Sequence, residues 1–281
     1  MKYLVTGGNG YLGRGVIQEL INRGDTVIAT DIKFREKKLE NVVYLEKDIF
    51  KCENLYQEFG QPDVLIHLAW RDGFRHNSPV HMEDLSQHYK FITEMYESGI
   101  RHIVVLGSMH EVGYHEGALD ENTPTKPLSL YGVAKNALRE SLQIYFKDKD
   151  VVFQWIRGFY IVKNTEEGCS IFSKIVQEEH KGTATFPFTT GKNKYDFMDY
   201  SEFCEKLVMI ARQEKYKGCI NCCSGVPMSL SERVESFIRE NHFNIKLNYG
   251  VFPDREYDSP AIWGDNTIIK LIGEENVEEN C

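Results

Sequence analysis

The sequence predicts an α/β fold, a doubly wound parallel sheet with a smaller lobe at its C-terminal end. Three observations support this prediction. Short apolar runs alternate with amphipathic stretches through the first two-thirds of the chain, as in sheets whose strands are connected by helices. Several of these runs are continuously apolar, which suits parallel strands that are covered on both faces. A glycine-rich turn at residues 6–13 separates the first run from the first amphipathic stretch.

The composition is that of a globular protein, since 42% of the 281 residues are hydrophobic and 27% are charged. The net charge of −9 argues against a duplex-binding protein, so no nucleic-acid partner is expected. No apolar run approaches the roughly 20 residues that span a bilayer, and the N-terminus lacks a secretory pattern. We therefore expect a cytoplasmic protein without a membrane partner, whose seven cysteines are free thiols and hold no metal.

Residues 1–159 are expected to form the main domain, with six strands and three helices. The strands are expected at residues 3–5, 26–29, 42–45, 64–66, 103–106 and 151–156. The first helix follows the glycine turn and reaches Ile21, because apolar residues recur there at helical spacing. The other two run from about 83 to 97, where Ser98-Gly99 is a stop signal, and from about 130 to 146.

Residues 160–281 are expected to form the smaller lobe, interleaved with late elements near 195–222 that return to the main sheet. Helices are expected at residues 170–179 and 201–212, after a cap at Ser229 or Ser231, and from Asn266 onward. Strands are expected at residues 218–221 and 245–249.

The glycine turn, TGGNGYLG, lies between a strand and a helix, the context in which such turns bind dinucleotides. Gly7 permits a tight turn, Gly10 lets a pyrophosphate approach the backbone, and Gly13 lets helix and strand pack closely. The free N–H groups of the helix N-terminus favour the phosphates. The turn therefore predicts a Rossmann-type dinucleotide site, with Tyr11 and Leu12 beside the cofactor.

The residues after the second and third strands bear on the choice of cofactor. Asp31 ends the second strand, where a carboxylate accepts hydrogen bonds from the ribose hydroxyls of an adenosine and favours NAD(H). Lys33 and Arg35 follow at once and could hold the 2′-phosphate of NADP(H), which stays an alternative. Asp48-Ile49, after the third strand, is expected to flank the adenine.

Tyr131 and Lys135 lie one helical turn apart and share a helix face. A Lys cation and an oxidised nicotinamide both stabilise a phenolate, so we expect the pKa of Tyr131 to be lowered. A phenol tuned in this way exchanges a proton with a substrate oxygen near neutral pH. We therefore predict that both residues are catalytic and that both contact the cofactor, with Lys135 holding the nicotinamide ribose.

Several segments together carry a resemblance to one family. They are TGGNGYLG at 6–13, Asp31, Asp48-Ile49, His67-Leu68-Ala69, GSMHEVGY at 107–114, Tyr131, Lys135, Arg157 and DFMDY at 196–200. Over nearly its whole length the chain resembles an extended short-chain dehydrogenase/reductase of the NAD-dependent epimerase/dehydratase family, which acts on nucleotide sugars. The resemblance implies that Leu68 and Ala69 line the cofactor site and that the smaller lobe binds the nucleotide-diphosphate sugar. It also implies a homodimer formed through the helices near 83–97 and 131–146.

In this family a Ser or Thr after the fifth strand binds the sugar oxygen. Two hydroxyl residues usually follow that strand, and the second of them is the catalytic one. Here Ser108 matches the first position, and Met109, which donates no hydrogen bond, fills the second. Ser108 is therefore the third predicted catalytic residue, with His110 or Glu111 as alternative sources of the polar contact.

Four residues are predicted to bind the substrate: Arg71, His110, Arg157 and Arg255. Arg71 follows the fourth strand, at the sheet edge where ligands of open α/β sheets bind. Arg157 matches an Arg that contacts substrate phosphate in the family, although Tyr160 replaces the Asn that usually accompanies it. Arg255 lies where similar enzymes place an Arg on the substrate diphosphate, which a guanidinium fork binds well.

The resemblance implies an NAD(P)-dependent enzyme. We predict that it reduces the 4-keto group of an NDP-4-keto-6-deoxyhexose, with Tyr131 as the proton donor. The preference for a reductase rests on the absence of the Asp-Glu pair that dehydratases use, because His110 occupies the Asp position. An NDP-sugar 4-epimerase with tightly bound NAD and a non-catalytic dinucleotide sensor are the alternatives.

Overall fold

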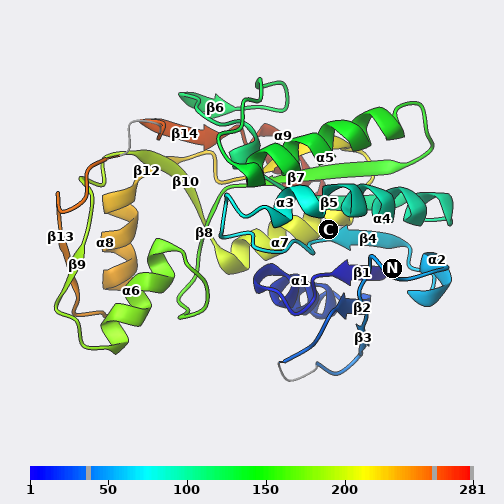
Figure 1. Ribbon diagram of the computed structural model, residues 1–281, viewed down its shortest axis with the longest axis horizontal. Coiled ribbons are helices and arrows are strands. Elements are labelled where there is room, and N and C mark those ends of the chain that lie inside the picture. The colour runs from blue at the N-terminus through cyan, green and yellow to red at the C-terminus, as the bar shows by residue number, and fades with distance from the viewer. Residues whose placement is uncertain (36–38, 255–257, 279–281) are drawn as a thin grey trace.

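The computed structural model describes residues 1–35, 39–254 and 258–278. Its main element is a seven-stranded parallel sheet with the strand order β11-β7-β5-β4-β1-β2-β3 (Figure 1). The strands are β1 (Lys2–Thr6), β2 (Thr26–Asp31), β3 (Val42–Glu46), β4 (Val64–His67), β5 (His102–Ser108), β7 (Val152–Gly158) and β11 (Gly218–Cys222). The strand order reverses between β1 and β4, so the carboxyl ends of these strands open the crevice where such sheets bind ligands.

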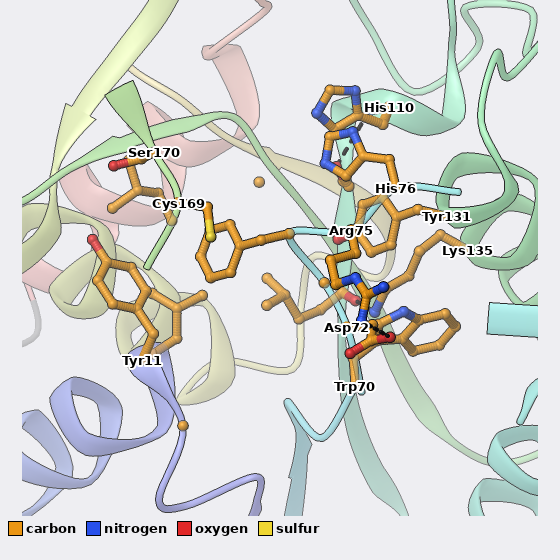
Figure 2. A pocket seen from close by; sticks show the side chains of 18 of the residues that line it. Tyr11, Trp70, Asp72, Arg75, His76, His110, Tyr131, Lys135, Cys169 and Ser170 are labelled. Carbon is orange, nitrogen blue, oxygen red and sulfur yellow. Dashed lines mark hydrogen bonds and ion pairs between the residues drawn. The ribbon is translucent and has the colours of Figure 1, made fainter. Parts of the chain in front are cut away.

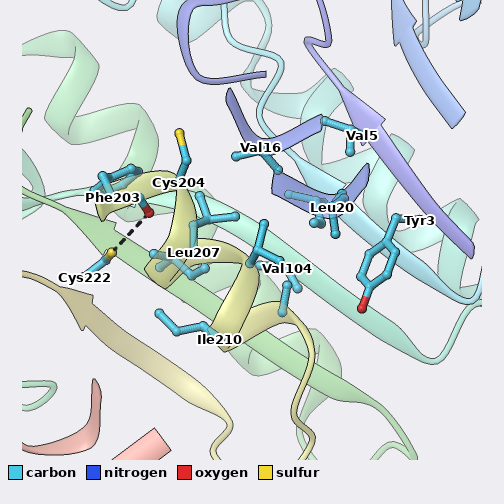
Figure 3. Close-up of a cluster of buried hydrophobic side chains, with 14 of the residues drawn as sticks. Tyr3, Val5, Val16, Leu20, Val104, Phe203, Cys204, Leu207, Ile210 and Cys222 are labelled. Carbon is cyan, nitrogen blue, oxygen red and sulfur yellow. Dashed lines mark hydrogen bonds between the residues drawn. The ribbon is translucent and has the colours of Figure 1, made fainter. Parts of the chain in front are cut away.

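Helices cover both faces of this sheet. On one face, α1 (Tyr11–Asn22), α7 (Tyr200–Ala211) and α9 (Thr267–Glu278) bury apolar side chains against the strands. Figure 3 shows this layer, in which Val16 and Leu20 of α1, Leu207 of α7 and Val5 of the sheet belong to one buried apolar cluster. The opposite face is covered by α2 (Leu55–Glu58), α4 (Leu85–Glu97) and α5 (Leu130–Phe146). The predicted doubly wound parallel fold is therefore confirmed.

The smaller lobe is built around a second sheet with the order β12-β10-β14-β6, in which β8 also pairs with β10. Its strands are β6 (Gly117–Leu119), β8 (Tyr160–Val162), β10 (Lys194–Asp199), β12 (Pro227–Ser229) and β14 (Ala261–Gly264). A two-stranded pair, β9 (Thr185–Pro187) and β13 (Lys246–Asn248), lies beside α6 (Ile171–His180) and α8 (Leu230–Glu240) (Figure 1). No helix in the described ranges has the length and apolar character needed to cross a bilayer.

The late elements divide between the two sheets. β11 pairs with β7 and α7 covers the main sheet, as expected. β10, which lies in the same predicted segment, instead pairs with β8, β12 and β14 in the second sheet. The carboxylate of Asp196 fixes this position, because it accepts hydrogen bonds from the backbone N–H groups of Ser224, Gly225 and Gly264.

Helix boundaries follow the local capping residues. α5 begins after Ser129, whose hydroxyl accepts the N–H of Gly132, and it spans the predicted residues. The open choice of cap for α8 is settled in favour of Ser229, which forms a capping box with Glu232. The helix expected from about 83 is interrupted at Asp84, which separates α3 (Val80–Glu83) from α4.

Candidate active site

A cavity of about 1910 Å³ lies between the carboxyl ends of the main strands and the second sheet. This volume is about twice the upper end of the range for small-ligand pockets, roughly 1,000 Å³, so the cavity has room for a dinucleotide and a sugar nucleotide together. Most of the predicted site residues line it. They are Gly7, Gly10, Tyr11, Leu12, Gly13, Asp31, Asp48, Ile49, Leu68, Ala69, Arg71, Ser108, His110, Tyr131 and Lys135.

The glycine turn lines one part of the cavity, called here the cofactor half because the turn is the predicted dinucleotide site. Gly7 has φ +69°, and a Cβ there would lie 2.8 Å from the backbone nitrogen of Ala69. A Cβ at Gly13 would lie 2.1 Å from the carbonyl oxygen of Gly7, so only glycine allows α1 to approach the turn. Gly10 is the N-cap of α1, and no side chain caps the helix there. The N-terminal N–H groups of α1 are thus left for an anion.

Asp31 is held at the end of β2 beside the turn. Its carboxylate accepts hydrogen bonds from the N–H groups of Asn9 at 3.0 Å and Ile32 at 2.8 Å. Because these bonds fix the side chain at the cavity wall, the remaining oxygen lone pairs are available to ribose hydroxyls. The glycines, the helix N-terminus and this carboxylate therefore fit a dinucleotide with free adenosine hydroxyls.

Lys135 is buried beneath the cavity, with 3% of its surface exposed. Its ammonium donates to the carbonyl of Leu106 at 2.7 Å and lies 3.8 Å from the centre of the Trp70 ring. Burial lowers the pKa of Lys135 to about 7, although the negative charge of Glu111 opposes the shift. This amine can therefore gain or lose a proton near neutral pH.

Tyr131 faces the same cavity from α5 (Figure 2). Burial raises the pKa of Tyr131 to about 12, although a hydrogen bond with the Ser108 side chain lowers it. We expected the pKa of Tyr131 to be lowered. For the groups of the chain itself this expectation is wrong, because the loss of hydration raises the pKa by more than the hydrogen bond with Ser108 lowers it. The phenol is therefore protonated at neutral pH, the form that can donate a proton.

Ser108 ends β5 between the cavity and the core. Its hydroxyl accepts the N–H of His110, and its own N–H donates to the carboxylate of Glu111 at 2.6 Å. Glu111 is completely buried and does not line the cavity, so it is excluded as the alternative polar contact. Met109 packs into the core of the smaller lobe, and both Met109 and His110 line the cavity.

The predicted substrate arginines have different surroundings. Arg71 lines the cavity and makes a bidentate ion pair with Asp84. Arg157 has an exposure of 0% and donates to the carbonyl of Asp120, so the predicted substrate contact is wrong in this structure. Its side chain extends into the core rather than into the cavity. Arg255 lies outside the described residues.

The sequence interpretation passed over a histidine beside the Tyr131 phenol. His76 stacks on the Tyr131 ring with centroids 5.3 Å apart, and its ring lies 4.5 Å from that of His110 (Figure 2). The available signal was position, since the polar segment after β4 leaves the sheet at its ligand-binding edge. Within the described parts of the chain, no group of three or more His, Cys, Asp or Glu is arranged to hold a metal ion.

The fold and this cavity define a dinucleotide-dependent enzyme of the doubly wound α/β class. The model of the NAD dependent epimerase/dehydratase family matches residues 3–223, and the chain belongs to that family. The resemblance seen in the sequence is thus confirmed, and NAD is the cofactor on which the family depends.

The curated relatives that match along most of the chain include a dehydrogenase and a putative epimerase. The dTDP-6-deoxy-L-talose 4-dehydrogenase (NAD(+)) of Aggregatibacter actinomycetemcomitans is 40% identical over 273 residues, which cover 94% of this chain and 99% of the relative. A putative UDP-glucose 4-epimerase of Methanocaldococcus jannaschii is 24% identical over 274 residues, which cover 92% of this chain and 85% of the relative.

Solved structures share the fold. A UDP-N-acetylglucosamine 4-epimerase from Methanobrevibacter ruminantium M1 superposes with a TM-score of 0.83 at 17% identity, covering 96% of this chain and 91% of that chain. A UDP-glucose 4-epimerase from Thermotoga maritima superposes with a TM-score of 0.81 at 19% identity, covering 97% of this chain and 93% of that chain.

Proposed function

We propose that this protein is an NAD(H)-dependent oxidoreductase that acts at C4 of a nucleotide-activated 6-deoxyhexose and reduces its 4-keto group. The observation that carries the proposal is the meeting of Tyr131, Lys135 and Ser108 in one cavity with the glycine turn. The 40% identical relative is named as a 4-dehydrogenase of a dTDP-6-deoxysugar, which is the same redox step written in the opposite direction.

The chemistry divides between the cofactor and the side chains. The glycine turn and Asp31 would hold the cofactor, which in its reduced form, NADH, would supply the hydride that C4 gains. Tyr131 donates its phenolic proton to the C4 oxygen, so the carbonyl becomes a hydroxyl and a phenolate is left behind. The hydroxyl of Ser108 binds the same oxygen and orients it toward Tyr131. Lys135 stabilises the phenolate by its charge and returns a proton to it, a role that suits an amine with a pKa of about 7.

The position of Glu111 supports a reductase over a dehydratase. Removal of water from a sugar needs an acid and a base beside the reacting carbons. Glu111, the acidic residue that follows Ser108, is sealed in the core against Trp155 and Arg139. His110 takes the position next to it, and burial lowers the pKa of its imidazole to about 4.

A turnover assay with the purified protein tests the proposal. It uses NADH and a dTDP-4-keto-6-deoxyhexose, with the UDP and GDP forms in parallel, and follows absorbance at 340 nm and the sugar product. We expect one NADH oxidised for each 4-hydroxy sugar formed. Interconversion of two 4-hydroxy sugars without net NADH oxidation would instead identify a 4-epimerase. Cofactor binding without turnover on any of these sugars would identify a dinucleotide sensor.

The homodimer through α4 and α5 stays a prediction. Ile92 of α4 and Leu138 and Leu142 of α5 are fully buried against the sheet, so they are not available to a partner. The outer face of α5 carries Ile144, which is 76% exposed, and Val133. Light scattering of the wild-type protein and of Ile144→Glu tests the prediction, which requires a dimer that the substitution dissociates.

A further inference from the structure

The segment from Trp70 to Asn77 caps the helix that carries the catalytic pair. The carbonyl of His76 accepts the N–H of Tyr131 at 2.8 Å, and the side-chain oxygen of Asn77 accepts the N–H of Leu130 at 3.3 Å. The first N–H groups of a helix have no partner within the helix, so these bonds attach the segment to α5 at Tyr131 itself. The segment and the phenol are thus fixed relative to each other.

The side chain of His76 covers one face of the phenol. Its ring lies parallel to that of Tyr131, with an interplanar angle of 13° and centroids 5.3 Å apart. His81 meets the same phenol at an angle of 63° and a centroid distance of 5.4 Å. Since stacked and edge-on rings restrict rotation about the side-chain bonds, these contacts select one direction for the phenolic oxygen.

The indole of Trp70 supports the ammonium of Lys135 in a comparable way. Lys135 Nζ lies 3.8 Å from the ring centre, within the range of a cation–π interaction. The indole stacks on His88 at 4.4 Å and 12°, and its N–H donates to Nδ1 of His81 at 3.1 Å. His81 in turn donates from Nε2 to the carbonyl of Arg75. The ring that faces Lys135 therefore cannot turn away.

We propose that Trp70 and His76 are positioning residues for the catalytic pair, with Trp70 fixing the ammonium of Lys135 and His76 fixing the phenol of Tyr131. The kinetic consequences of this inference rest on the proposed function, because they require turnover of the sugar. Its structural content, the orientation of two side chains by two rings, can be measured without any sugar substrate.

Variants that keep or remove each ring test the kinetic part. Trp70→Phe and His76→Phe retain a flat ring, whereas Trp70→Leu and His76→Leu retain bulk without one. We expect the leucine variants to lower kcat about tenfold with KM changed less than about twofold, and the phenylalanine variants to recover most of the loss. Equal losses in both members of a matched pair, or a change in KM alone, would overturn the positioning role.

A pH titration tests the contact with Trp70 directly. The groups that face Lys135 are Glu111, which stabilises its charge, together with Tyr131 and the imidazoles of His67 and His88. Loss of the ring removes a contact that favours the ammonium, so the pKa of Lys135 should fall further in Trp70→Leu than in Trp70→Phe.

The readout is the NMR signal of Lys135 Cε in protein that carries ¹³C-labelled lysine, assigned by its loss in Lys135→Met. We expect a ring-current shift in the wild type and in Trp70→Phe that disappears in Trp70→Leu, together with the lower titration midpoint. An unshifted signal in the wild type, or equal midpoints in the two variants, would refute the inference whether or not the protein reduces a sugar. A clear shift without turnover would refute only the proposed function.

Discussion

The carboxylate of Glu111 holds the backbone of Ser108 from the core side, through an N–H···O hydrogen bond of 2.6 Å. The same carboxylate accepts the indole N–H of Trp155 and lies 3.3 Å from the guanidinium of Arg139 and 3.9 Å from that of Arg157. These contacts lie on the core side of Ser108, whose hydroxyl is proposed to bind the sugar oxygen. A buried charge cluster therefore sets where β5 ends.

Glu111→Gln tests this cluster. The amide keeps the shape and one acceptor oxygen but removes the negative charge that faces the guanidinium groups of Arg139 and Arg157 in the core. We expect the free energy of unfolding to fall by about 3 kcal/mol, measured by urea unfolding. The exposed Glu274→Gln is the control and should stay within about 0.5 kcal/mol of the wild type. A loss at Glu111 as small as that of the control would show that the carboxylate is not charged in the fold.

Tyr131→Phe tests the proton donor. The substitution removes only the phenolic oxygen, so the ring contacts with His76 and His81 are kept. We expect kcat to fall by a factor of about 10² to 10⁴, the usual contribution of a general acid. The NAD dissociation constant from calorimetry should change less than about threefold. Turnover at the wild-type rate would remove Tyr131 from the chemistry.

Lys135→Met should change how stability depends on pH. The pKa of Lys135 is about 7 in the folded protein and the ordinary model value, 10.5, in the unfolded chain. Between these values the unfolded chain binds more protons, so the stability of the wild type rises with pH across this window. The variant lacks this dependence. The free energy of unfolding of the variant minus that of the wild type should therefore be greatest below pH 7. This difference should fall by roughly 1.4 kcal/mol per pH unit, and so by a few kcal/mol in all, towards pH 10.

Urea unfolding of both proteins from pH 6 to pH 10 measures this difference. Titrating groups that do not interact with Lys135 contribute equally to the two proteins, so their contributions cancel in the difference. A difference in stability that is constant across the window would show that Lys135 has the same pKa in the folded and unfolded states.

Gly13→Ala should damage the cofactor half of the cavity. The added Cβ would lie 2.1 Å from the carbonyl oxygen of Gly7, so either the turn or α1 must move. We expect the variant to lose NAD binding by at least about tenfold and to unfold at a lower temperature. Gly273→Ala in α9 is the matched control, because its Cβ would meet only the sulfur of Met209 at 3.9 Å. Normal NAD affinity in Gly13→Ala would mean that the turn does not bind the pyrophosphate.

Asp31→Asn addresses the preference between the two dinucleotides. The amide weakens the hydrogen bonds to ribose hydroxyls and removes the charge that repels a 2′-phosphate. We expect the NAD dissociation constant to rise about tenfold, so that the ratio of the affinity for NAD to the affinity for NADP becomes smaller. Calorimetry with both cofactors measures both constants. Tighter binding of NADP than of NAD to the wild type would reverse the interpretation and point to Lys33 and Arg35.

Local signals predicted the main sheet well, and long-range pairing accounts for what they missed. The bounds of α5 follow from its cap at Ser129 and its apolar stripe, both of which are written in adjacent residues. Strands of three residues, such as β6 and β9, are too short to show a period of two. The membership of β10 depends on Asp196 binding residues far along the chain, which no local pattern reveals.

The candidate site also combines features that local sequence signals predict with features that depend on long-range contacts. The glycine turn and the pair Tyr131 and Lys135 are recognisable because their chemistry needs fixed spacings along the chain. The stacking of His76 on Tyr131 needs the segment after β4 to fold back onto α5, which spacing does not encode. Among the groups of the chain itself, burial dominates the pKa of Tyr131, and burial is a property of the whole fold that residue spacing does not reveal.

The pairing of β6 with β14 has a consequence for how the polypeptide can be divided. β6 belongs to the early half of the chain yet completes the second sheet, while β11 from the late half completes the first. A gene fragment that ends at any one point between them therefore encodes two unfinished sheets with bare edges. Truncated products should aggregate, and no single breakpoint divides the chain into two pieces that each hold one complete sheet.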